Sequence, residues 1–255
     1  MLAWTTRRQR REGLFQVAHT LERSLLPDAL PAVEGLQLAS VYRPAIEDSE
    51  AGGDFYDAFL RPSGCWLVVG DVCGKDADAA ALTAMVRHSI RALAFRETSP
   101  AQVLRTVNEI MLSHDLAVRF ATAIVARIDL AARPVRATIA SAGHPPPVLL
   151  GAGLEAHCPR VAGTFLGVLP RPHLDDVEVS LPDGATLVLY TDGLCDAGAP
   201  TRTLSTQELC SQLAGHADLA PPQLTRLLEE LAVVRGGGRL RDDIAILAVR
   251  VGEAA

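Results

Sequence analysis

Residues 65–76 read CWLVVGDVCGKD, and they are the most informative stretch of the sequence. The apolar run from Cys65 to Val69 is typical of a buried strand, and it leads to Asp71, which adjoins a glycine. Gly74 follows the acid, and an alanine-rich helical pattern begins at Ala77. The stretch therefore predicts a strand that carries a carboxylate near its end, followed by a short loop and a helix.

Similar acidic points occur at the end or start of three other hydrophobic runs: Gly52-Gly53-Asp54, Asp192-Gly193 and Asp242-Asp243. A single Asp-Gly pair at a strand end is usually only a turn. Carboxylates that converge, however, repel one another and raise one another's pKa values unless a cation lies among them. Mg²⁺ and Mn²⁺ prefer such oxygen ligands, so the four points together predict a divalent metal centre.

The other polar motifs exclude several kinds of hydrolase. The seven histidines form no H-x-x-x-H or H-E-x-x-H pattern, which argues against a zinc enzyme. His144 lies in a proline-rich turn, where we expect it to serve loop structure. Neither a G-x-S-x-G elbow nor a Cys-x₅-Arg phosphate loop occurs, so no protein nucleophile is indicated. The spacing of Gly70 and Gly74, with Asp76 in place of Ser or Thr, also rules out a P-loop.

The order of the expected elements favours an α+β layered domain over a doubly wound parallel sheet, because strands are grouped around helix pairs. We expect strands over 36–42, 65–71, 121–130, 135–140, 148–150, 177–181, 186–190 and 244–251. We expect helices over 77–96, from Ser99 to about 117, after the capping-box pattern Ser205–Glu208, and over 222–234.

Length and composition narrow the class of protein. The 255 residues are 49% hydrophobic and 21% charged, which indicates a globular chain of one or two domains. A net charge of −6 makes nucleic acid a poor candidate partner. The five cysteines are widely spaced without a C-x-x-C pair, so we expect no disulfide framework and a reducing, cytoplasmic location. No apolar stretch of 18 residues predicts a membrane span, and the N-terminus does not have the pattern of a signal peptide.

The N-terminal 30 residues form a separate part of the predicted organisation. Residues 7–26 have apolar side chains at helical spacing, and Pro27 and Pro31 end the pattern. Such a helix is too short to fold alone. It packs on its own domain, on a second copy to form a homodimer, or on an upstream domain. We therefore divide the chain into a helix with its linker at 1–30 and a domain at 31–253.

Six blocks in order carry a resemblance to a known family. They are Gly52-Gly53-Asp54-Phe55-Tyr56-Asp57, Gly70-Asp71-Val72-Cys73-Gly74-Lys75, Ala79-Ala80-Ala81-Leu82, Ala142-Gly143-His144-Pro145-Pro146, Leu189-Tyr190-Thr191-Asp192-Gly193 and Arg241-Asp242-Asp243-Ile244. Together they resemble the bacterial SpoIIE/RsbU-type serine phosphatases, the prokaryotic branch of the metal-dependent type 2C protein phosphatases. The resemblance covers roughly residues 35–251.

The resemblance implies a four-layer α-β-β-α sandwich with two Mn²⁺ or Mg²⁺ ions between the sheets. By motif match, the metal ligands would be Asp54, Asp71, Val72 through its carbonyl, Asp192, Asp242 and Asp243. Asp71 would bridge the ions, and Asp54, Asp71, Asp192 and Asp242 would form the catalytic set. Of Asp242 and Asp243, we favour Asp242 as the metal ligand, because it occupies the first position of the family's acidic pair. Two ions about 3.5–4 Å apart can activate a water for attack on a phosphoryl group.

The function implied by the resemblance is hydrolysis of phosphoserine or phosphothreonine on a regulatory protein. The family substrate is a phosphorylated anti-anti-sigma factor, which acts in a partner-switching pathway. A catalytically inactive pseudophosphatase that binds a phosphoprotein is the alternative. A two-metal nuclease would need a positive groove, and the acidic balance of the chain argues against it.

Several residues depart from the family pattern or have two interpretations. Asp76 replaces the usual glycine and either recruits a cation or, as we favour, caps the following helix. Phe165 replaces the usual proline, which leaves the local loop shape open. Arg43 is a weak candidate for holding phosphate, and surface solvation is the favoured interpretation. Cys73 and Cys195 adjoin metal motifs, where small buried thiols are a commoner explanation than a redox switch.

Overall fold

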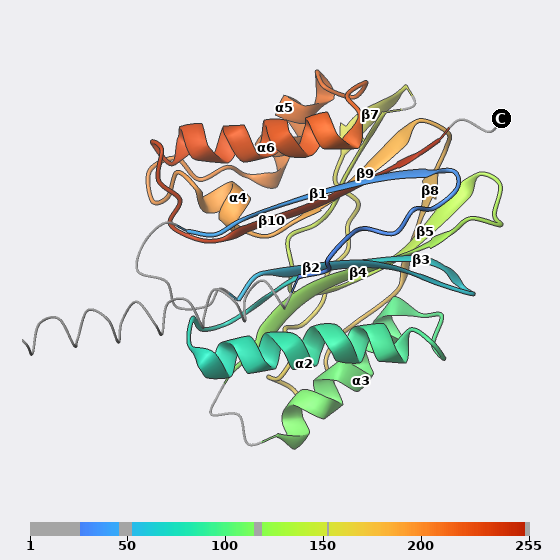
Figure 1. Cartoon of the computed structure of the whole chain (residues 1–255), viewed down its shortest axis with the longest axis vertical. Helices are drawn as coiled ribbons and strands as arrows, with labels where there is room; N and C mark the ends of the chain where they lie inside the picture. The colour runs from blue at the N-terminus through green and yellow to red at the C-terminus, as the bar shows by residue number, and fades with distance from the viewer. Residues whose placement is uncertain (1–25, 46–52, 115–118, 152, 253–255) are drawn as a thin grey trace, which may run out of the picture.

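The computed structural model describes residues 26–45, 53–114, 119–151 and 153–252. Two five-stranded sheets lie face to face, and helices cover the outer face of each (Figure 1). Neighbouring strands in both sheets of the described ranges pair antiparallel. The expected α+β class and α-β-β-α layering are therefore confirmed. Among the described residues, no helix is long and apolar enough to cross a membrane.

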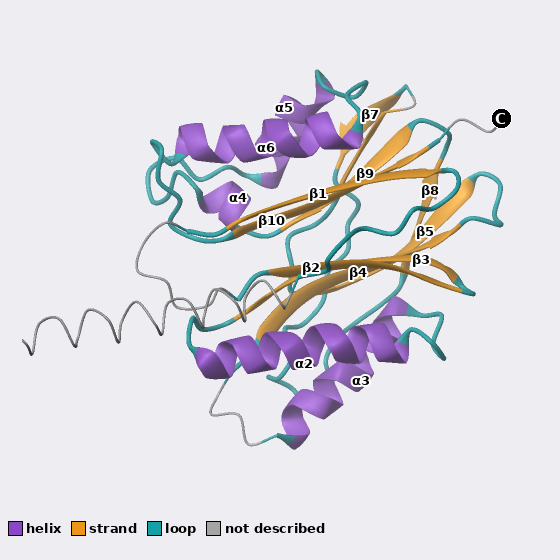
Figure 2. Cartoon of the chain, in the orientation of Figure 1, coloured by secondary structure: helices purple, strands orange, loops and turns teal. Residues whose placement is uncertain are grey.

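The first sheet contains both ends of the described chain. Its strand order is β1 (Leu36–Arg43), β10 (Ile244–Val251), β9 (Ala185–Tyr190), β6 (Val148–Gly151) and β7 (Leu154–His157). Its outer face is covered by the three C-terminal helices (Figure 2), which are α4 (Gly193–Asp196), α5 (Thr206–Ala214) and α6 (Pro221–Arg235). The long β1–β10 pairing joins Leu36 to Val251 and Arg43 to Ile244, so the two ends of the domain stabilise each other.

The second sheet is built from the middle of the chain. Its strand order is β2 (Phe55–Arg61), β3 (Gly64–Val72), β4 (Ala121–Asp129), β5 (Val135–Ala142) and β8 (Val177–Leu181). The helix pair α2 (Ala77–Leu93) and α3 (Pro100–Ser113) covers its outer face (Figure 1). Helix α2 follows β3 after a loop of four residues, as the sequence predicts.

The apolar core has three layers, one between each pair of neighbouring structural layers. Side chains such as Leu67, Ile124 and Leu247 fill the space between the sheets. A second cluster packs α2 and α3 on one sheet, and a third packs α4 to α6 on the other. Inner strands such as β3, β9 and β10 are buried on both faces, which explains why they read as nearly continuous apolar runs.

Three helix starts follow the predicted capping chemistry. Asp76 accepts a hydrogen bond from the Ala79 amide at 2.9 Å, so it is an N-cap as favoured. Ser99 caps α3 through the Gln102 amide, and Ser205 with Glu208 forms the expected capping box of α5. The expected helix over residues 7–26 and the last predicted turn beyond α3 lie outside the described residues, apart from Leu26 and His114.

Strands β2 and β7 and the short helix α4 are absent from the sequence-based prediction. In β2 the polar Asp57 interrupts the apolar pattern, yet this residue has no exposed surface. Arg87 donates to its carboxylate at 3.1 Å and Arg91 at 3.0 Å, both from α2. The carboxylate is thus paired on burial, which is the condition under which a charged side chain is tolerated inside a protein.

One expectation about the cysteines is wrong. Cys158, which follows β7, forms a disulfide with Cys210 of α5, across a sequence separation of 52 residues. Their wide spacing gave no sign of pairing, but packing of α5 beside β7 brings the two residues together. Cys65, Cys73 and Cys195 are free thiols.

Candidate metal centre

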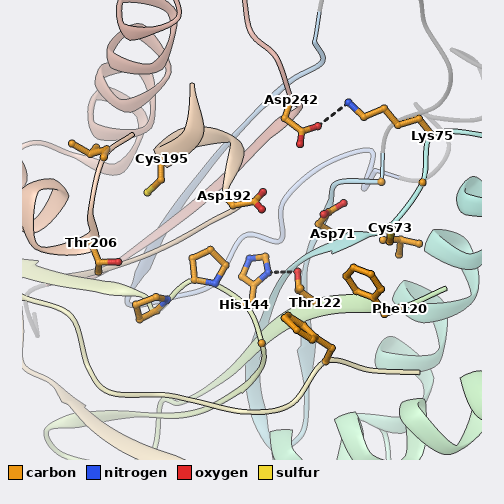
Figure 3. Close-up of a pocket in the computed structure, with 18 of the residues that line it drawn as sticks. Asp71, Cys73, Lys75, Phe120, Thr122, His144, Asp192, Cys195, Thr206 and Asp242 are labelled. Carbon is orange, nitrogen blue, oxygen red and sulfur yellow. Dashed lines mark hydrogen bonds and ion pairs between the residues drawn. The ribbon is translucent and has the colours of Figure 1, made fainter. Parts of the chain in front are cut away.

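A pocket of about 850 Å³ opens at the edge of the sandwich where three acidic points meet. Asp71 comes from the end of β3, Asp192 directly precedes α4, and Asp242 precedes β10. Figure 3 shows their carboxylates around the same space, with Lys75 beside Asp242. Residues far apart in the sequence thus supply one acidic wall.

The sheet topology explains why these acids meet. Strands β9 and β10 are antiparallel neighbours in which Tyr190 faces Ile246. The end of β9 and the start of β10 therefore lie at the same end of the sheet, which places Asp192 near Asp242. The facing sheet contributes the end of β3, where Asp71 pairs with Thr122 of β4.

Asp71 has the environment expected of a carboxylate that binds a cation. Burial raises the pKa of its carboxyl to about 7, with further increases from the negative charges of Asp192, Asp242 and Asp243. The positive charge of Lys75 acts in the opposite direction. Ionisation of Asp71 therefore costs free energy that a bound cation would offset.

Asp54 and Asp192 show the same effect. Only 5% of Asp54 is exposed, and burial, followed by the charge of Asp71, raises its pKa well above the usual range. The hydroxyl of Thr191 partly compensates by donating to the Asp54 carboxylate at 2.7 Å. Burial, then the charge of Asp242, also raises the pKa of Asp192.

The two neighbouring acids 242 and 243 occupy different environments. Asp242 is half exposed, lines the pocket, and pairs with the Lys75 ammonium at 2.8 Å. Asp243 is buried, and its carboxylate accepts a hydrogen bond from the Ala45 amide at 2.8 Å. Because both charges act on Asp71, both lie near the acidic cluster.

The donor set fits a hard divalent ion. Carboxylates dominate it, and Gly53 packs so closely on the Val72 carbonyl that a Cβ at this position would collide with the oxygen. As placed, the His, Cys, Asp and Glu side chains of the described ranges form no group of three that could hold a metal ion. The Lys75 ammonium pairs with one oxygen of Asp242, so a bound ion would share this carboxylate with the lysine.

His144 joins the two sheets beside this wall. It is buried, its Nε2 donates to the Tyr190 carbonyl at 3.1 Å, and its Nδ1 accepts from the Thr122 hydroxyl at 2.8 Å. A carbonyl only accepts, which fixes the tautomer. Burial lowers the pKa of His144 to about 3, so the ring is neutral at neutral pH. The neutral ring therefore connects Thr122 of one sheet to Tyr190 of the other through its two hydrogen bonds.

The remaining sequence candidates have different outcomes. Arg43 lies outside the pocket lining and pairs with Glu229 of α6 at 2.8 Å, so it does not face the acidic cluster. Cys73 is exposed and Cys195 half-buried, so the expectation of buried thiols is wrong for Cys73. Burial raises the pKa of Cys195 to about 11, which disfavours its reactive thiolate.

Sequence patterns missed the polar groups that support the acids. Thr122 contacts His144 from the middle of the chain, and no local motif marks it. Thr191 lies inside a quoted motif, directly before Asp192, and that adjacency was the one available signal. Arg119, which pairs with Asp76 at 2.8 Å beside the loop after β3, had none.

A protein-family model described as Stage II sporulation protein E (SpoIIE) matches residues 61–252. The chain belongs to the SpoIIE family. Among curated relatives, Protein IcfG of Synechocystis sp. is 26% identical over 259 residues, covering 90% of this chain and 40% of that protein. Phosphoserine phosphatase RsbU of Bacillus subtilis is 22% identical, covering 92% of this chain and 69% of that protein.

The SpoIIE fold extends to solved structures. The RsbU and RsbW domains of a Mycobacterium tuberculosis protein superpose with a TM-score of 0.74 at 28% identity, covering 89% of this chain and 62% of that one. This SpoIIE-family chain spans well under two thirds of Protein IcfG and slightly under two thirds of the mycobacterial structure. Its similarity therefore concerns one region of longer proteins.

Proposed function

We propose that this chain is a divalent-metal-dependent protein phosphatase that hydrolyses phosphoserine or phosphothreonine. The observation that carries the proposal is the convergence of Asp71, Asp192 and Asp242 on one pocket. The buried Asp54 does not line this pocket but lies close enough to it for the charges of Asp71 and Asp192 to add to the effect of burial in raising its pKa. Membership of the SpoIIE family supports it, as does similarity to a protein named phosphoserine phosphatase.

In this proposal Asp54, Asp71, Asp192 and Asp242 hold Mn²⁺ or Mg²⁺ together with the Val72 carbonyl. Their ionised oxygens supply the hard donors that these cations need. When bound, two such ions lower the pKa of a water and neutralise phosphoryl oxygens. Thr191 keeps the Asp54 carboxylate oriented through its 2.7 Å hydrogen bond. We place Asp243 beside the ligands, because its hydrogen bond to Ala45 fixes one carboxylate oxygen.

We further propose that the substrate is a phosphorylated anti-anti-sigma factor. Similarity to RsbU, and to a mycobacterial structure that contains RsbU and RsbW domains together, supports a partner-switching role. The acidic balance of the chain, with a net charge of −6, favours a protein substrate over nucleic acid.

The organisation into residues 1–30 and 31–253 is also a proposal. The amphipathic pattern of residues 7–26 supports a helix that pairs with a second copy and transmits a signal to the metal centre. Light scattering on the full chain and on a variant lacking residues 1–30 tests this. If each protein has the mass of its own monomer, the proposed dimer is wrong.

The proposed activity is tested by steady-state hydrolysis of para-nitrophenyl phosphate and of a phosphoserine peptide with and without Mn²⁺. We expect Mn²⁺-dependent turnover that Asp71→Asn reduces at least about 100-fold, since electrostatic groups of this type contribute that much to rate. Asp129→Asn is the matched control, because Asp129 ends β4 and does not line the pocket.

The alternative, a pseudophosphatase, predicts a different result in the same assay. It would bind Mn²⁺ and phosphopeptide without turnover. Turnover that persists in both Asp71→Asn and Asp192→Asn would instead contradict the assignment of the metal centre.

A further inference from the structure

The pocket has two chemically different sides. One side carries the carboxylates described above, and the other is lined by apolar residues, namely Phe120, Pro145, Pro146, Phe165 and Leu204. Its volume of about 850 Å³ lies in the range that accommodates drug-sized molecules, which is more than one phosphoseryl side chain occupies. In the proposed function the acidic residues hold the metal ions that bind the phosphoryl group, so the apolar residues have room for neighbouring atoms of the substrate.

Phe120 and Phe165 form the exposed part of this apolar side, and we name the pair the aromatic lip. Their ring centroids are 5.5 Å apart with planes inclined at 45°, a favourable aromatic arrangement. Phe120 is 38% exposed and Phe165 44% exposed, although both line the pocket. Figure 3 shows the Phe120 ring near Thr122 and Asp71. Large apolar surfaces left in water beside a polar centre are typical of interaction sites.

The lip is held in place by backbone pairing. Leu166, next to Phe165, exchanges two hydrogen bonds with Ala121, next to Phe120, at 3.1 and 2.9 Å. The Phe165 ring also lies directly against Gly143, where any Cβ would collide with it. Both rings are therefore positioned before a ligand arrives, which limits the entropy lost on binding.

The loop that follows Phe165 exposes two further apolar residues. Val168 is 49% exposed and Leu169 46% exposed, so Phe120, Phe165, Val168 and Leu169 make up four of the eight exposed large hydrophobics in the described ranges. Asn108 fixes the loop by accepting from the Gly167 amide and donating to the Leu169 carbonyl, both at 2.9 Å. Of these four residues, Phe120 and Phe165 line the pocket together with the acidic residues.

We propose that the aromatic lip binds an apolar side chain next to the phosphorylated residue of the protein substrate, and so determines sequence preference. This inference rests on the proposed phosphatase function. Phe120 and Phe165 line the same pocket as Asp71 and Asp192, and this commits the lip to one occupant. A phosphoryl group bound by metal ions that these carboxylates hold would place the flanking residues of the same chain beside the two rings.

Two phosphoserine peptides of equal charge test the lip, one with leucine and one with serine on both sides of the phosphoserine. Fluorescence polarisation with Mn²⁺ measures their affinities for the full chain, independently of turnover. We expect the leucine peptide to bind roughly tenfold more tightly, the effect of partly burying one leucine-sized side chain. Phe165→Ala and, separately, Phe120→Ala should abolish most of this preference and leave the affinity for the serine peptide unchanged.

Val234→Ala is the matched control, since Val234 is 76% exposed on α6 and does not line the pocket. It should retain the leucine preference. Equal binding of the two peptides by the unmodified chain, or a preference that survives both phenylalanine substitutions, would overturn the proposal. The proposal would also be overturned if the unmodified chain shows no peptide preference and forms a dimer that Phe165→Ala converts to a monomer. The aromatic lip would then be the interface with a second copy of the chain.

Failure of the proposed function has a separate signature. If para-nitrophenyl phosphate is not hydrolysed but the leucine preference is present and lost on Phe165→Ala, the lip stands and the catalytic assignment fails. If hydrolysis is Mn²⁺-dependent but the preference is absent, the catalytic assignment stands and the lip fails.

Discussion

Lys75 and Asp242 form a half-exposed ion pair at the mouth of the acidic cluster. Burial lowers the pKa of the Lys75 ammonium, while its hydrogen bond to Asp242 and the nearby acids raise it, with a raised pKa as the net result. The lysine is therefore charged at neutral pH and competes with any divalent ion for Asp242. The Asp242 carboxylate can therefore be neutralised either by Lys75 or by a bound divalent ion.

Lys75→Met should tighten Mn²⁺ binding. The substitution frees Asp242 and removes a positive charge, so we expect the dissociation constant to fall roughly two- to fivefold, the equivalent of a solvent-exposed ion pair. Titration calorimetry on the full chain measures this. Lys75→Arg keeps the charge and should bind as the unmodified chain does, and weaker binding by Lys75→Met would contradict the competition.

Helix α2 is attached to β2 by a buried ion pair as well as by apolar packing. Asp57 has no exposed surface, and Arg87, which pairs with it, is only 5% exposed. This ion pair attaches α2 to the second sheet. Helix α2 follows Asp71 in the chain after the short loop 73–76, so the pair also fixes the far end of that loop.

Asp57→Ala should lower the free energy of unfolding by about 3–5 kcal/mol, because it leaves Arg87 buried without its carboxylate. Urea unfolding followed by circular dichroism measures the loss. Arg226→Ala is the control, since its pair with Glu230 is exposed and should be worth at most about 1 kcal/mol. Equal effects of the two substitutions would show that the buried pair does not hold the helix.

His144 links β4 to the end of β9, and this link should make stability depend on pH. Its pKa of about 3 lies below the ordinary value of 6.5, so the unfolded chain takes up a proton there that the folded chain does not. The contribution of neutral His144 is therefore present above pH 6.5 and is lost as the pH falls toward 3. His144→Gln removes this titration.

Urea unfolding of both proteins at pH 8 and pH 5 tests the sign. The stability advantage of the unmodified chain over His144→Gln should shrink by about 2 kcal/mol at pH 5, from 1.36 kcal/mol per pH unit below pH 6.5. The buried acids have raised pKa values, so their effect on stability changes with pH in the opposite direction. Because both proteins contain these acids, their contribution cancels when the two free energies of unfolding are subtracted. An advantage that grows at pH 5 would contradict the burial of a neutral ring.

Much at the element scale could be predicted from sequence, and the exceptions have physical causes. Apolar strands and side-chain caps such as Asp76 depend on local residues, so their patterns are visible. Strand β2 was missed because Asp57 is buried through partners on another element. The aromatic lip was also missed, because it depends on pairing of Ala121 with Leu166. Phe165 was singled out only as a departure from the family pattern.

At the scale of the whole molecule, the Cys158–Cys210 disulfide connects the edge strand β7 to α5, the helix whose first residues line the pocket. Closing a loop of 52 residues restricts the unfolded chain and is worth about 4 kcal/mol in the chain-entropy model. The bridge thus adds to the packing of the helices on the first sheet.

Thiol alkylation under denaturing, non-reducing conditions should label three cysteines of the air-oxidised protein, and reduction should raise the number to five. Reductant should also lower the urea midpoint of the unmodified chain and leave that of a Cys158→Ser/Cys210→Ser variant unchanged. Five labelled cysteines before reduction would show that the bridge does not form.

In the proposed function, the two facing sheets bring their acids together to hold divalent metal. The most direct test is a crystal structure with Mn²⁺, with anomalous scattering recorded at the manganese edge. We predict anomalous density in the pocket, within about 2.0–2.3 Å of carboxylate oxygens of Asp71 and Asp192, the range of oxygen ligands to small divalent ions. Density confined to other parts of the molecule, or none at saturating Mn²⁺, would contradict the claim.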